Sequence, residues 1–554
     1  MTSAETTPKP ASDLYSCNGP QFKQLAEAAL IWLETNKELV NALNVFPIPD
    51  GDTGTNMSLT MQAAMREIAP MNDRSAGRVA HALAHGALMG ARGNSGVILS
   101  QIWRGFARAI DGSETIDAPL FASALREAST TAYRASVRPV EGTILTVIKD
   151  AALAAEDAAT RHRELRTLLE RIVSAAHNSV ERTPDLLPVL KQAGVVDSGG
   201  KGLTIMLEGM LRYLRGLPLD VAVETAFRPL KLDAVGAAME TIEPGQEWEV
   251  IVDFKPRGSI DVSSMYGRLE AMGTAIQVGE GDGMYRVHIH LLKSRRYEPL
   301  EMAEDLGTIT NVHMENLLAQ VGEGDVEPLK LATVSAGQIG VVAVSPGDGL
   351  SRVLASLGAA AIVGGGQAQN PSTEDILRAV DDLPTDHVII LPNNKNIILA
   401  ANQVVSLSSK QVRVVPSRSV PQGVAALLQL LPDGDLAQVA GAMEHAITQV
   451  NTGEVTLATR TVELNGVAIR DGQHIGLSNG QIVVAGEGLE STLLALLEKM
   501  DAGSHEVLTL YRGQDISEPD ADALAGQIRV RYPELNIESH FGGQPHYPFI
   551  LSLE

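Results

Sequence analysis

The chain has 554 residues, a length that predicts about three domains. Its residues are 44% hydrophobic and 20% charged, which is typical of a globular protein. It contains 44 lysines and arginines and 67 aspartates and glutamates, which gives a formal net charge of −23. This excess of negative charge argues against a nucleic-acid-binding surface and against electrostatic binding to an anionic membrane. The single cysteine, Cys17, excludes an internal disulfide framework.

Residues 1–20 are rich in threonine, proline and serine and contain no apolar h-region, so we expect a flexible tail and no secretory signal. No apolar run approaches the roughly 18 residues that are needed to span a bilayer. We therefore expect a cytoplasmic protein without an integral membrane segment.

Residues 21–216 have the periodicity of helices. Phe22, Leu25, Ala29 and Trp32 recur at helical spacing, and the pattern resumes at Leu39 after a polar break. Alanine- and leucine-rich stretches follow near residues 58–68, 76–90, 96–110, 118–135, 145–158, 163–180 and 202–215. This pattern predicts an all-α domain of about eight helices, with no strand before about residue 217.

The hydrophobic pattern of the sequence changes after residue 216. Residues 248–254 and 285–290 alternate as strands do, which predicts a small α/β middle domain over residues 217–325. Short apolar runs at 340–344, 387–391 and 411–415 are each followed by a helical stretch. That alternation is typical of a parallel sheet, so residues 326–554 are predicted to form a C-terminal α/β domain.

The first candidate for chemistry is the constrained polar string from residue 44 to residue 56. Asp50 and Asp52 flank one glycine, so in a turned loop both carboxylates can point the same way. Paired hard oxygen ligands suit Mg²⁺, which also accepts phosphate oxygens. Hydroxyl and amide groups that a phosphate could contact follow directly, on Thr53, Thr55 and Asn56.

An Asx-turn between two helices is the alternative interpretation of this string. An EF-hand is excluded, because Thr55 stands where that loop needs glycine and Met61 stands where it needs glutamate.

Two glycine-rich turns each precede a helical run, at residues 90–96 and 197–202. The N–H groups exposed by such turns suit an anion, although each turn alone is more often a simple helix connection or a cap. The Walker signature is absent, because Lys201 is followed by glycine. Any nucleotide site here is therefore not of the P-loop class.

Taken in order, these motifs resemble the DhaL-type kinase domain. The segments that carry the resemblance are LNVFPIPDGDTGTNMSLT, LMGARGNSGVILSQIWRGF, EGTILTVIKDAA and DSGGKGL. The later segments resemble the DegV-like half of the kinase subunit of bacterial fatty acid kinase, and they are GGGQAQNPSTEDIL, VIILPNNKNIILAA, SRSVPQGVAAL and FGGQPHYPFILSLE. The resemblance covers nearly the whole chain from about residue 21.

The resemblance implies an all-α barrel that binds ATP through two Mg²⁺ ions held by aspartates. Asp50 and Asp52 would bind the ions, with Asn44 as a further candidate ligand. In dihydroxyacetone kinases a third aspartate precedes this pair by five residues. Val45 occupies that position here, so the third ligand must come from elsewhere.

The same resemblance assigns the remaining contacts with ATP. Thr53, Asn56, Ser95 and Gly96 would lie on the phosphate side, within a nucleotide-binding set that also includes Thr55, Asn94, Thr143, Asp197, Ser198 and Gly199. Thr143 and the turn that begins at Asp197 would form the wall near the sugar and base. Arg92 would stabilise charge on the transferring phosphoryl group, and a surface ion pair is its alternative role.

A zinc site in the middle domain is a further expectation from the resemblance. His288 and His290 lie two apart on one predicted strand, so they face the same way. A cysteine completes such a pair in the kinase subunit of fatty acid kinase, and Glu247 aligns with that cysteine here. Ordinary partly buried histidines are the alternative.

The function implied is ATP-dependent phosphorylation of a fatty acid carboxylate that a separate DegV-like fatty-acid-binding protein presents. The product would be an acyl phosphate, for phospholipid metabolism, and the relatives suggest a homodimer. The two alternatives are a glycerone kinase that works with a separate substrate-binding protein and a nucleotide-binding scaffold without turnover.

Overall fold

A computed structural model describes residues 14–44, 51–136, 139–219, 228–229, 248–258, 260, 262–281, 284–292, 295–316, 329–366, 370–458, 461–464 and 466–554. The chain forms two compact units, one of Met1–Val221 with Leu329–Glu554 and one of Ala222–Pro328. The second unit overlaps the middle domain that the sequence predicts over residues 217–325. Among the described residues, no helix is both long enough and apolar enough to cross a membrane.

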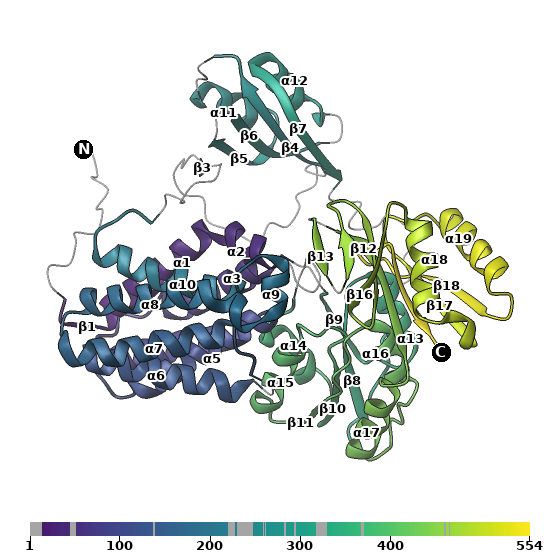
Figure 1. Ribbon diagram of the computed structural model, residues 1–554, viewed down its shortest axis with the longest axis horizontal. Coiled ribbons are helices and arrows are strands. Elements are labelled where there is room, and N and C mark those ends of the chain that lie inside the picture. Colours follow the sequence, from purple (N-terminus) through teal and green to yellow (C-terminus); the bar gives the residue numbers. More distant parts are fainter. Residues whose placement is uncertain are drawn as a thin grey trace. The chain divides into compact units, whose positions relative to one another are not determined.

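The N-terminal part of the first unit is helical, as predicted (Figure 1). In its described residues, eight long helices form the body, namely α1 (Gly19–Thr35), α3 (Thr53–Ile68), α4 (Ala76–Met89), α5 (Gly93–Ala109), α6 (Ala118–Ala135), α7 (Ile144–Arg161), α8 (Leu165–Leu186) and α10 (Ser198–Leu214). Two short helices, α2 (Lys37–Leu43) and α9 (Pro188–Ala193), complete the set. The predicted polar break falls at Asn36, between α1 and α2.

One continuous apolar core joins these helices. Its aromatic centre is a chain of ring contacts in which Phe106 stacks on Phe22 at 5.7 Å and meets Phe121 edge-on at 5.3 Å. Because alanine fills much of the remaining core, the helices can approach each other closely.

The start of the chain differs from the expectation of a flexible tail to residue 20 and no strand before residue 217. Strand β1 (Ser16–Asn18) pairs with β2 (Thr115–Asp117), and Cys17, the middle residue of β1, is fully buried. Asn18 then opens α1 through a capping box with Gln21. Three-residue strands are too short to produce a visible alternation, which is why the sequence did not reveal them.

The C-terminal part of the same unit begins with a four-stranded parallel sheet in the order β11-β10-β8-β9. The strands are β8 (Ile339–Ser345), β9 (Ala361–Gly364), β10 (His387–Leu391) and β11 (Gln411–Val414). Side chains alternate across the sheet. Val342 and Val344 pack with α14 (Thr373–Asp381) and α15 (Ile398–Leu407).

The opposite face of this sheet packs on other helices. Val341 and Ala343 lie in a cluster with α13 (Asp348–Ser356), α16 (Val420–Leu427) and α17 (Leu436–Ala446). The three predicted strands and the parallel class are therefore confirmed.

A six-stranded mixed sheet completes the unit, in the order β16-β15-β12-β19-β17-β18. Its strands are β12 (Asn451–Leu457), β15 (His474–Ser478), β16 (Gln481–Gly486), β17 (Val507–Arg512), β18 (Asn536–Phe541) and β19 (Phe549–Leu553). The remaining elements are the hairpin β13 (Val462–Leu464) and β14 (Val467–Ile469), with helices α18 (Leu489–Lys499) and α19 (Glu518–Arg531) and the 3-10 turn Ala502–Ser504.

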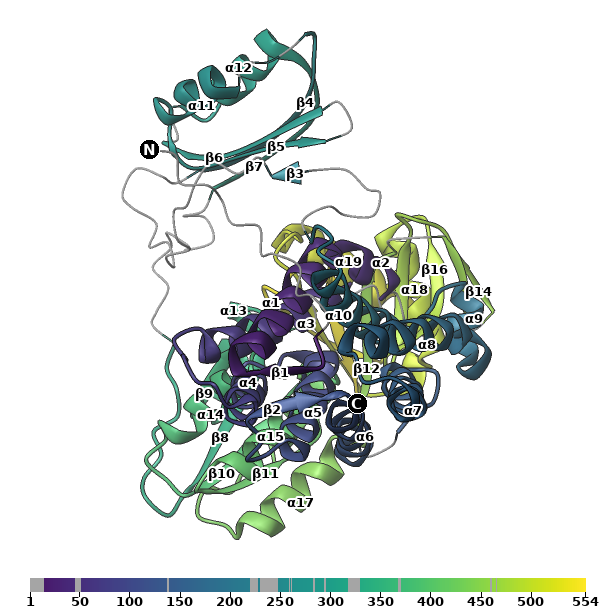
Figure 2. The same ribbon diagram turned by 90° about the vertical axis from the view of Figure 1, so that its left-hand side faces the viewer.

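The helical and C-terminal domains share apolar packing. Ala91 and Val97, at the start of α5, are buried in the cluster that covers the β8–β10 face beneath α14 and α15. Figure 2 shows α5 beside α15, and the backbone N–H of Thr373 donates to the carbonyl of Ala91 at 3.1 Å. The glycine-rich turn at residues 90–96 is thus held against the C-terminal domain.

The second unit is a small α/β domain, as predicted. Its sheet has the order β3-β5-β6-β4-β7, and α11 (Val262–Glu270) and α12 (Glu298–Leu306) accompany the sheet. The strands are β3 (Arg228–Pro229), β4 (Trp248–Pro256), β5 (Thr274–Gly281), β6 (Met284–Leu291) and β7 (Gly307–Asn316).

Candidate functional site

Four helix N-termini converge on one cavity in the first unit. The cavity has a volume of about 470 Å³ and is lined by the first residues or N-caps of α3, α5, α7 and α10. We call it the first cavity. Helix N-termini carry unpaired N–H groups and partial positive charge, so their convergence favours an anionic ligand.

Asp52 forms the N-cap of α3 and is 7% exposed. Its carboxylate receives two amide hydrogen bonds, from Asn44 Nδ2 at 3.2 Å to Oδ1 and from Asn370 Nδ2 at 2.6 Å to Oδ2. Asn370 belongs to the C-terminal domain, 318 residues along the chain. Asp50 and Val45 lie outside the described residues, so the pairing of the two aspartates remains a prediction.

In the first turn of α3, some polar side chains border the first cavity and one is turned towards α2. Thr53 borders the first cavity, and its hydroxyl oxygen accepts from Ser198 Oγ at 3.2 Å, which links α3 to α10. Asn56 also borders the cavity. Thr55 is turned towards α2, because its N–H and hydroxyl both bond to the side chain of Asn41.

The turn before α5 depends on glycine. Gly93 has a φ of +56°, and a Cβ there would lie 2.6 Å from Asn56 Nδ2. Asn94 and Ser95 follow and border the first cavity. Gly96 serves packing, because a Cβ at this position would lie 2.4 Å from Thr60 Oγ1.

Asp197 is both an N-cap and a wall of the first cavity. Its Oδ2 accepts from the N–H of Gly200 at 2.6 Å, so the capping interpretation of this turn is correct. Burial raises the pKa of Asp197 to about 6, and hydrogen bonds from the backbone of Gly200 and Ile144 offset part of this rise. Ser198 and Gly199 border the cavity beside it.

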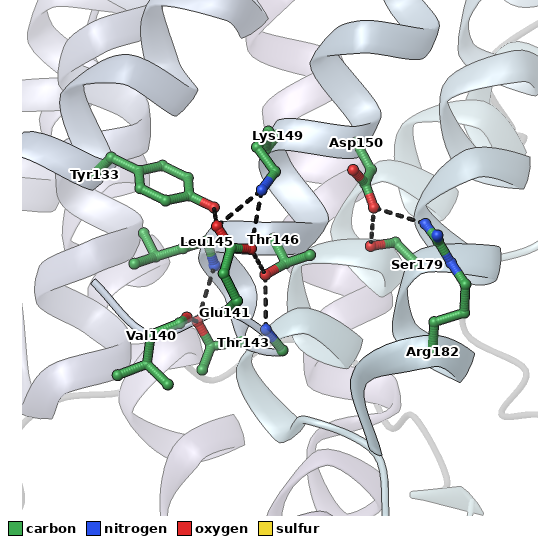
Figure 3. A network of polar contacts seen from close by, with 11 residues as sticks. Tyr133, Val140, Glu141, Thr143, Leu145, Thr146, Lys149, Asp150, Ser179 and Arg182 are labelled. Carbon is green, nitrogen blue, oxygen red and sulfur yellow. Dashed lines mark hydrogen bonds and ion pairs between the residues drawn. The ribbon is translucent and has the colours of Figure 1, made fainter. Parts of the chain in front are cut away.

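A polar network surrounds the N-terminus of α7 (Figure 3). The Thr143 hydroxyl donates to the carbonyl of Val140 at 2.7 Å and accepts from the N–H of Leu145. Glu141 receives hydrogen bonds from Lys149 and Thr146, which lower the pKa of its carboxyl group. Thr143 is therefore fixed at the rim of the first cavity.

Arg92 points away from this group of residues. Its Nη1 donates to the carbonyl of Asn370 at 2.8 Å, and its Nη2 lies 3.3 Å from Asp375 Oδ2. Both contacts lie in the C-terminal domain, so Arg92 ties the turn before α5 to that domain. Its predicted role at the phosphoryl group stays a prediction.

A second cavity of about 640 Å³ adjoins the first at Asn56. Arg92, Arg418 and Glu454 are among its lining residues. Burial raises the pKa of Glu454 to about 7, and the positive charge of Lys395 opposes that rise. This cavity can hold a ligand with both polar and apolar parts.

The surroundings of Asp52 fit a hard cation such as Mg²⁺. Asn370 is 2% exposed, and its Oδ1 is buried without a hydrogen-bond partner. An unpaired buried acceptor costs about 1–3 kcal/mol. A carboxylate and a spare amide oxygen in one buried place are ligands of the type that Mg²⁺ takes.

The described residues do not test the predicted zinc site. His288 pairs with Ile251 and His290 with Glu249 across β4, which places the histidines at alternate positions of β6. Glu247 lies outside the described residues. In the part of the chain that the structure describes, no three His, Cys, Asp or Glu side chains gather as a metal site, and the zinc site stays a prediction.

Three residues of the C-terminal domain were not predicted as parts of this site. Asn370 contacts Asp52, Asn396 accepts from Asn94 Nδ2 at 3.1 Å, and Lys395 borders the first cavity. Lys395 and Asn396 follow β10 at the carboxyl edge of the parallel sheet, where ligands favour binding. The position of Lys395 and Asn396 after a predicted strand could have indicated a ligand site, but the sequence does not show that they meet the motifs of the helical domain.

Two family models match the chain. One is the DAK2 domain, over residues 47–212, and the other is the FakA-like C-terminal domain of fatty acid kinase, over residues 340–554. Protein YloV of Bacillus subtilis (strain 168) is 39% identical over 552 residues, covering 97% of this chain and 99% of the relative. An uncharacterized protein of Staphylococcus aureus (strain MRSA252) is 36% identical over 549 residues, with the same coverage.

Solved structures give weaker likenesses. A DegV family protein from Thermus thermophilus, described by its fatty acid binding, has a TM-score of 0.30 and 14% identity, covering 39% of this chain and 99% of that chain. DegV from Bacillus subtilis has a TM-score of 0.30 and 11% identity with the same coverage. Scores at this level carry no assignment.

Alanine at Gly93 tests the close approach of α5 to α3. Gly93→Ala and Gly112→Ala both place alanine at a positive φ, of +56° and +70°, which costs about 1–2 kcal/mol. Only the Cβ at residue 93 meets a side chain, because nothing lies within 4 Å at residue 112. We expect Gly93→Ala to lose about 1–3 kcal/mol more free energy of unfolding, measured by chemical denaturation. Equal losses would contradict the packing.

Asp197→Asn tests the raised pKa of the partly buried Asp197 carboxylate in the nucleotide-free protein. Because the folded-state pKa of about 6 exceeds the ordinary 3.8, the folded protein binds this proton more tightly than the unfolded chain does. The wild type therefore loses stability as pH rises through this window, and the neutral isostere does not.

We expect the free energy of unfolding of Asp197→Asn, relative to wild type, to rise from about pH 4 to about pH 6 and then level off. The matched control is Asp117→Asn, at the exposed N-cap of α6. A difference for Asp197→Asn that is constant with pH would refute the raised pKa of this carboxyl group.

Proposed function

Because this chain belongs to the fatty acid kinase family, with a DAK2 domain joined to a FakA-like C-terminal region, we propose that it phosphorylates a fatty acid carboxylate with ATP and Mg²⁺. The acceptor would be presented by a separate DegV-like fatty-acid-binding protein. The family matches confirm the resemblance drawn from the sequence motifs.

The observation that carries this proposal is the convergence of four helix N-termini on the first cavity. Each helix contributes roughly half a positive charge, so four contribute roughly two. Asp52 and Asp197 supply two carboxylates against them. The positive helix ends and the two carboxylates therefore roughly cancel. A triphosphate with Mg²⁺ fits such a site better than a bare polyanion, because the cation offsets the repulsion between the carboxylates and the phosphates.

The proposed roles follow from where the side chains lie. Thr53, Asn56 and Ser95 border the cavity from α3 and α5 and would contact the phosphates. Thr143 and the Asp197 turn lie on the α7 and α10 side and would face the sugar and base. A volume of about 470 Å³ falls within the usual range for ligand pockets.

Asp52 would hold the magnesium, with Asp50 and Asn44 as further candidate ligands. When bound, Mg²⁺ would supply neutralisation of the phosphate oxygens. The residues themselves bind and orient ATP, and Asn44 keeps the Asp52 carboxylate in place through its 3.2 Å hydrogen bond.

The transfer needs no general base. A carboxylate oxygen of the acyl group forms a bond to the γ-phosphorus, and the bond from that phosphorus to the bridging oxygen breaks, which releases ADP. An ionised carboxylate carries no proton to remove, so catalysis depends on positioning and charge. This is consistent with a cavity whose walls provide dipoles and hydroxyl groups.

Asp52→Asn tests the proposal directly. The chain is incubated with ATP, Mg²⁺, a fatty acid and a DegV-like partner, and acyl phosphate is trapped with hydroxylamine. We expect Asp52→Asn, alone or with Asp50→Asn, to reduce hydroxamate formation about a hundredfold or more, because a magnesium ligand contributes several kcal/mol. Asp117→Asn serves as the control, and circular dichroism checks the helices.

Retained transfer in Asp52→Asn would contradict the metal assignment. Turnover of glycerone instead of fatty acid would point to a glycerone kinase. ATP binding without turnover, whichever partner is added, would point to a scaffold.

A further inference from the structure

The first cavity is lined by the C-terminal domain as well as by the helical domain. Among the described residues that line this cavity, Lys395 is the only basic one, while Asp52 and Asp197 are acidic. Lys395 lies in the turn between β10 and α15, in the C-terminal domain. The helical domain alone therefore offers, among these residues, dipoles and carboxylates but no side-chain cation for a phosphate.

The C-terminal domain also reaches the candidate metal ligand. Asn370 Nδ2 donates to Asp52 Oδ2 at 2.6 Å, and this contact is buried. One oxygen of the carboxylate is thereby fixed by the C-terminal domain, and the other is fixed by Asn44 of the helical domain at 3.2 Å. The unpaired Oδ1 of Asn370 lies within the same buried group.

Two further contacts hold the turn before α5 in register with these residues. Asn94 donates to Asn396 Oδ1 at 3.1 Å, next to Lys395. Arg92 donates to the carbonyl of Asn370, next to the Asp52 contact. The same turn is therefore clamped on both sides by the segments that carry Lys395 and Asn370.

We propose that the ATP site is shared between the two domains. In this arrangement Lys395 is the side-chain cation that contacts the terminal phosphates, and Asn370 is a positioning residue that fixes Asp52 for the metal. The inference rests on the proposed nucleotide site of the first cavity and adds a requirement for the C-terminal domain. It predicts that the helical domain's motifs are not sufficient for tight binding of a triphosphate.

Lys395→Gln tests the phosphate contact through nucleotide discrimination. Calorimetric titration of the full chain with the non-hydrolysable analogue AMP-PNP and with AMP, both with Mg²⁺, separates the phosphate end from the base. A charge-assisted hydrogen bond is worth about 1.5–3 kcal/mol, so AMP-PNP should bind roughly ten- to hundredfold more weakly. AMP should change less than about twofold, because it lacks the terminal phosphates.

The controls separate the inference from the proposed function. Lys499→Gln, at an exposed site on α18, should leave both affinities unchanged, and Lys395→Arg should restore much of the preference for AMP-PNP. Equal weakening of both ligands, or no weakening, would overturn the role of Lys395. If the wild-type chain fails to bind AMP-PNP at all, the proposed nucleotide site is itself wrong.

Asn370→Ala tests the positioning role with a metal readout. The Mn²⁺ concentration that half-saturates binding of AMP-PNP is measured, with thermal stability recorded in parallel. Loss of a partner of this kind should raise that concentration about ten- to hundredfold. A lower melting temperature with unchanged metal dependence would show that Asn370 only supports the domain contact.

Discussion

The structure of the first unit depends on one electrostatic constraint, the meeting of four helix N-termini at a single cavity. Their unpaired N–H groups and partial positive charges would repel each other without neighbouring anions. Asp52 and Asp197 occupy the N-cap positions of two of the helices and supply part of the opposing charge. The burial that raises the pKa of Asp197 to about 6 is a cost of this arrangement, and a bound anion with its own cation would complete the balance.

Two kinds of contact hold the two domains of the first unit together at this cavity. The turn that opens α5 sits on the apolar cluster of the parallel sheet through Ala91 and Val97. Asn370 and Asn396 then place amide groups beside Asp52 and Asn94. Apolar packing therefore sets the distance between the domains, and a small number of amide hydrogen bonds set the orientation of the polar groups. The family relationship extends over both domains, since the full-length relatives cover 97% of this chain.

Much of the fold could be predicted from the sequence, because long helices and buried strands have strong periodic patterns. The break at Asn36 and the strands at 340–344, 387–391 and 411–415 all lie where the sequence put them. The candidate site could be predicted only in part. Motifs on adjacent helices were visible, whereas nothing in the sequence linked Asn370 or Lys395 to the motifs of the helical domain. Their role depends on contacts across more than 300 positions, as for Asn370 and Asp52, and no local spacing encodes such a pairing.

The most direct test of the shared nucleotide site is a crystal structure of the full chain with AMP-PNP and Mn²⁺, in which anomalous scattering locates the metal. We expect manganese beside the Asp52 carboxylate, phosphates at the N-termini of α3 and α5, and the Lys395 ammonium within hydrogen-bond distance of a terminal phosphate oxygen. Nucleotide bound in the second cavity, between Arg418 and Glu454, or metal far from Asp52, would contradict the shared site.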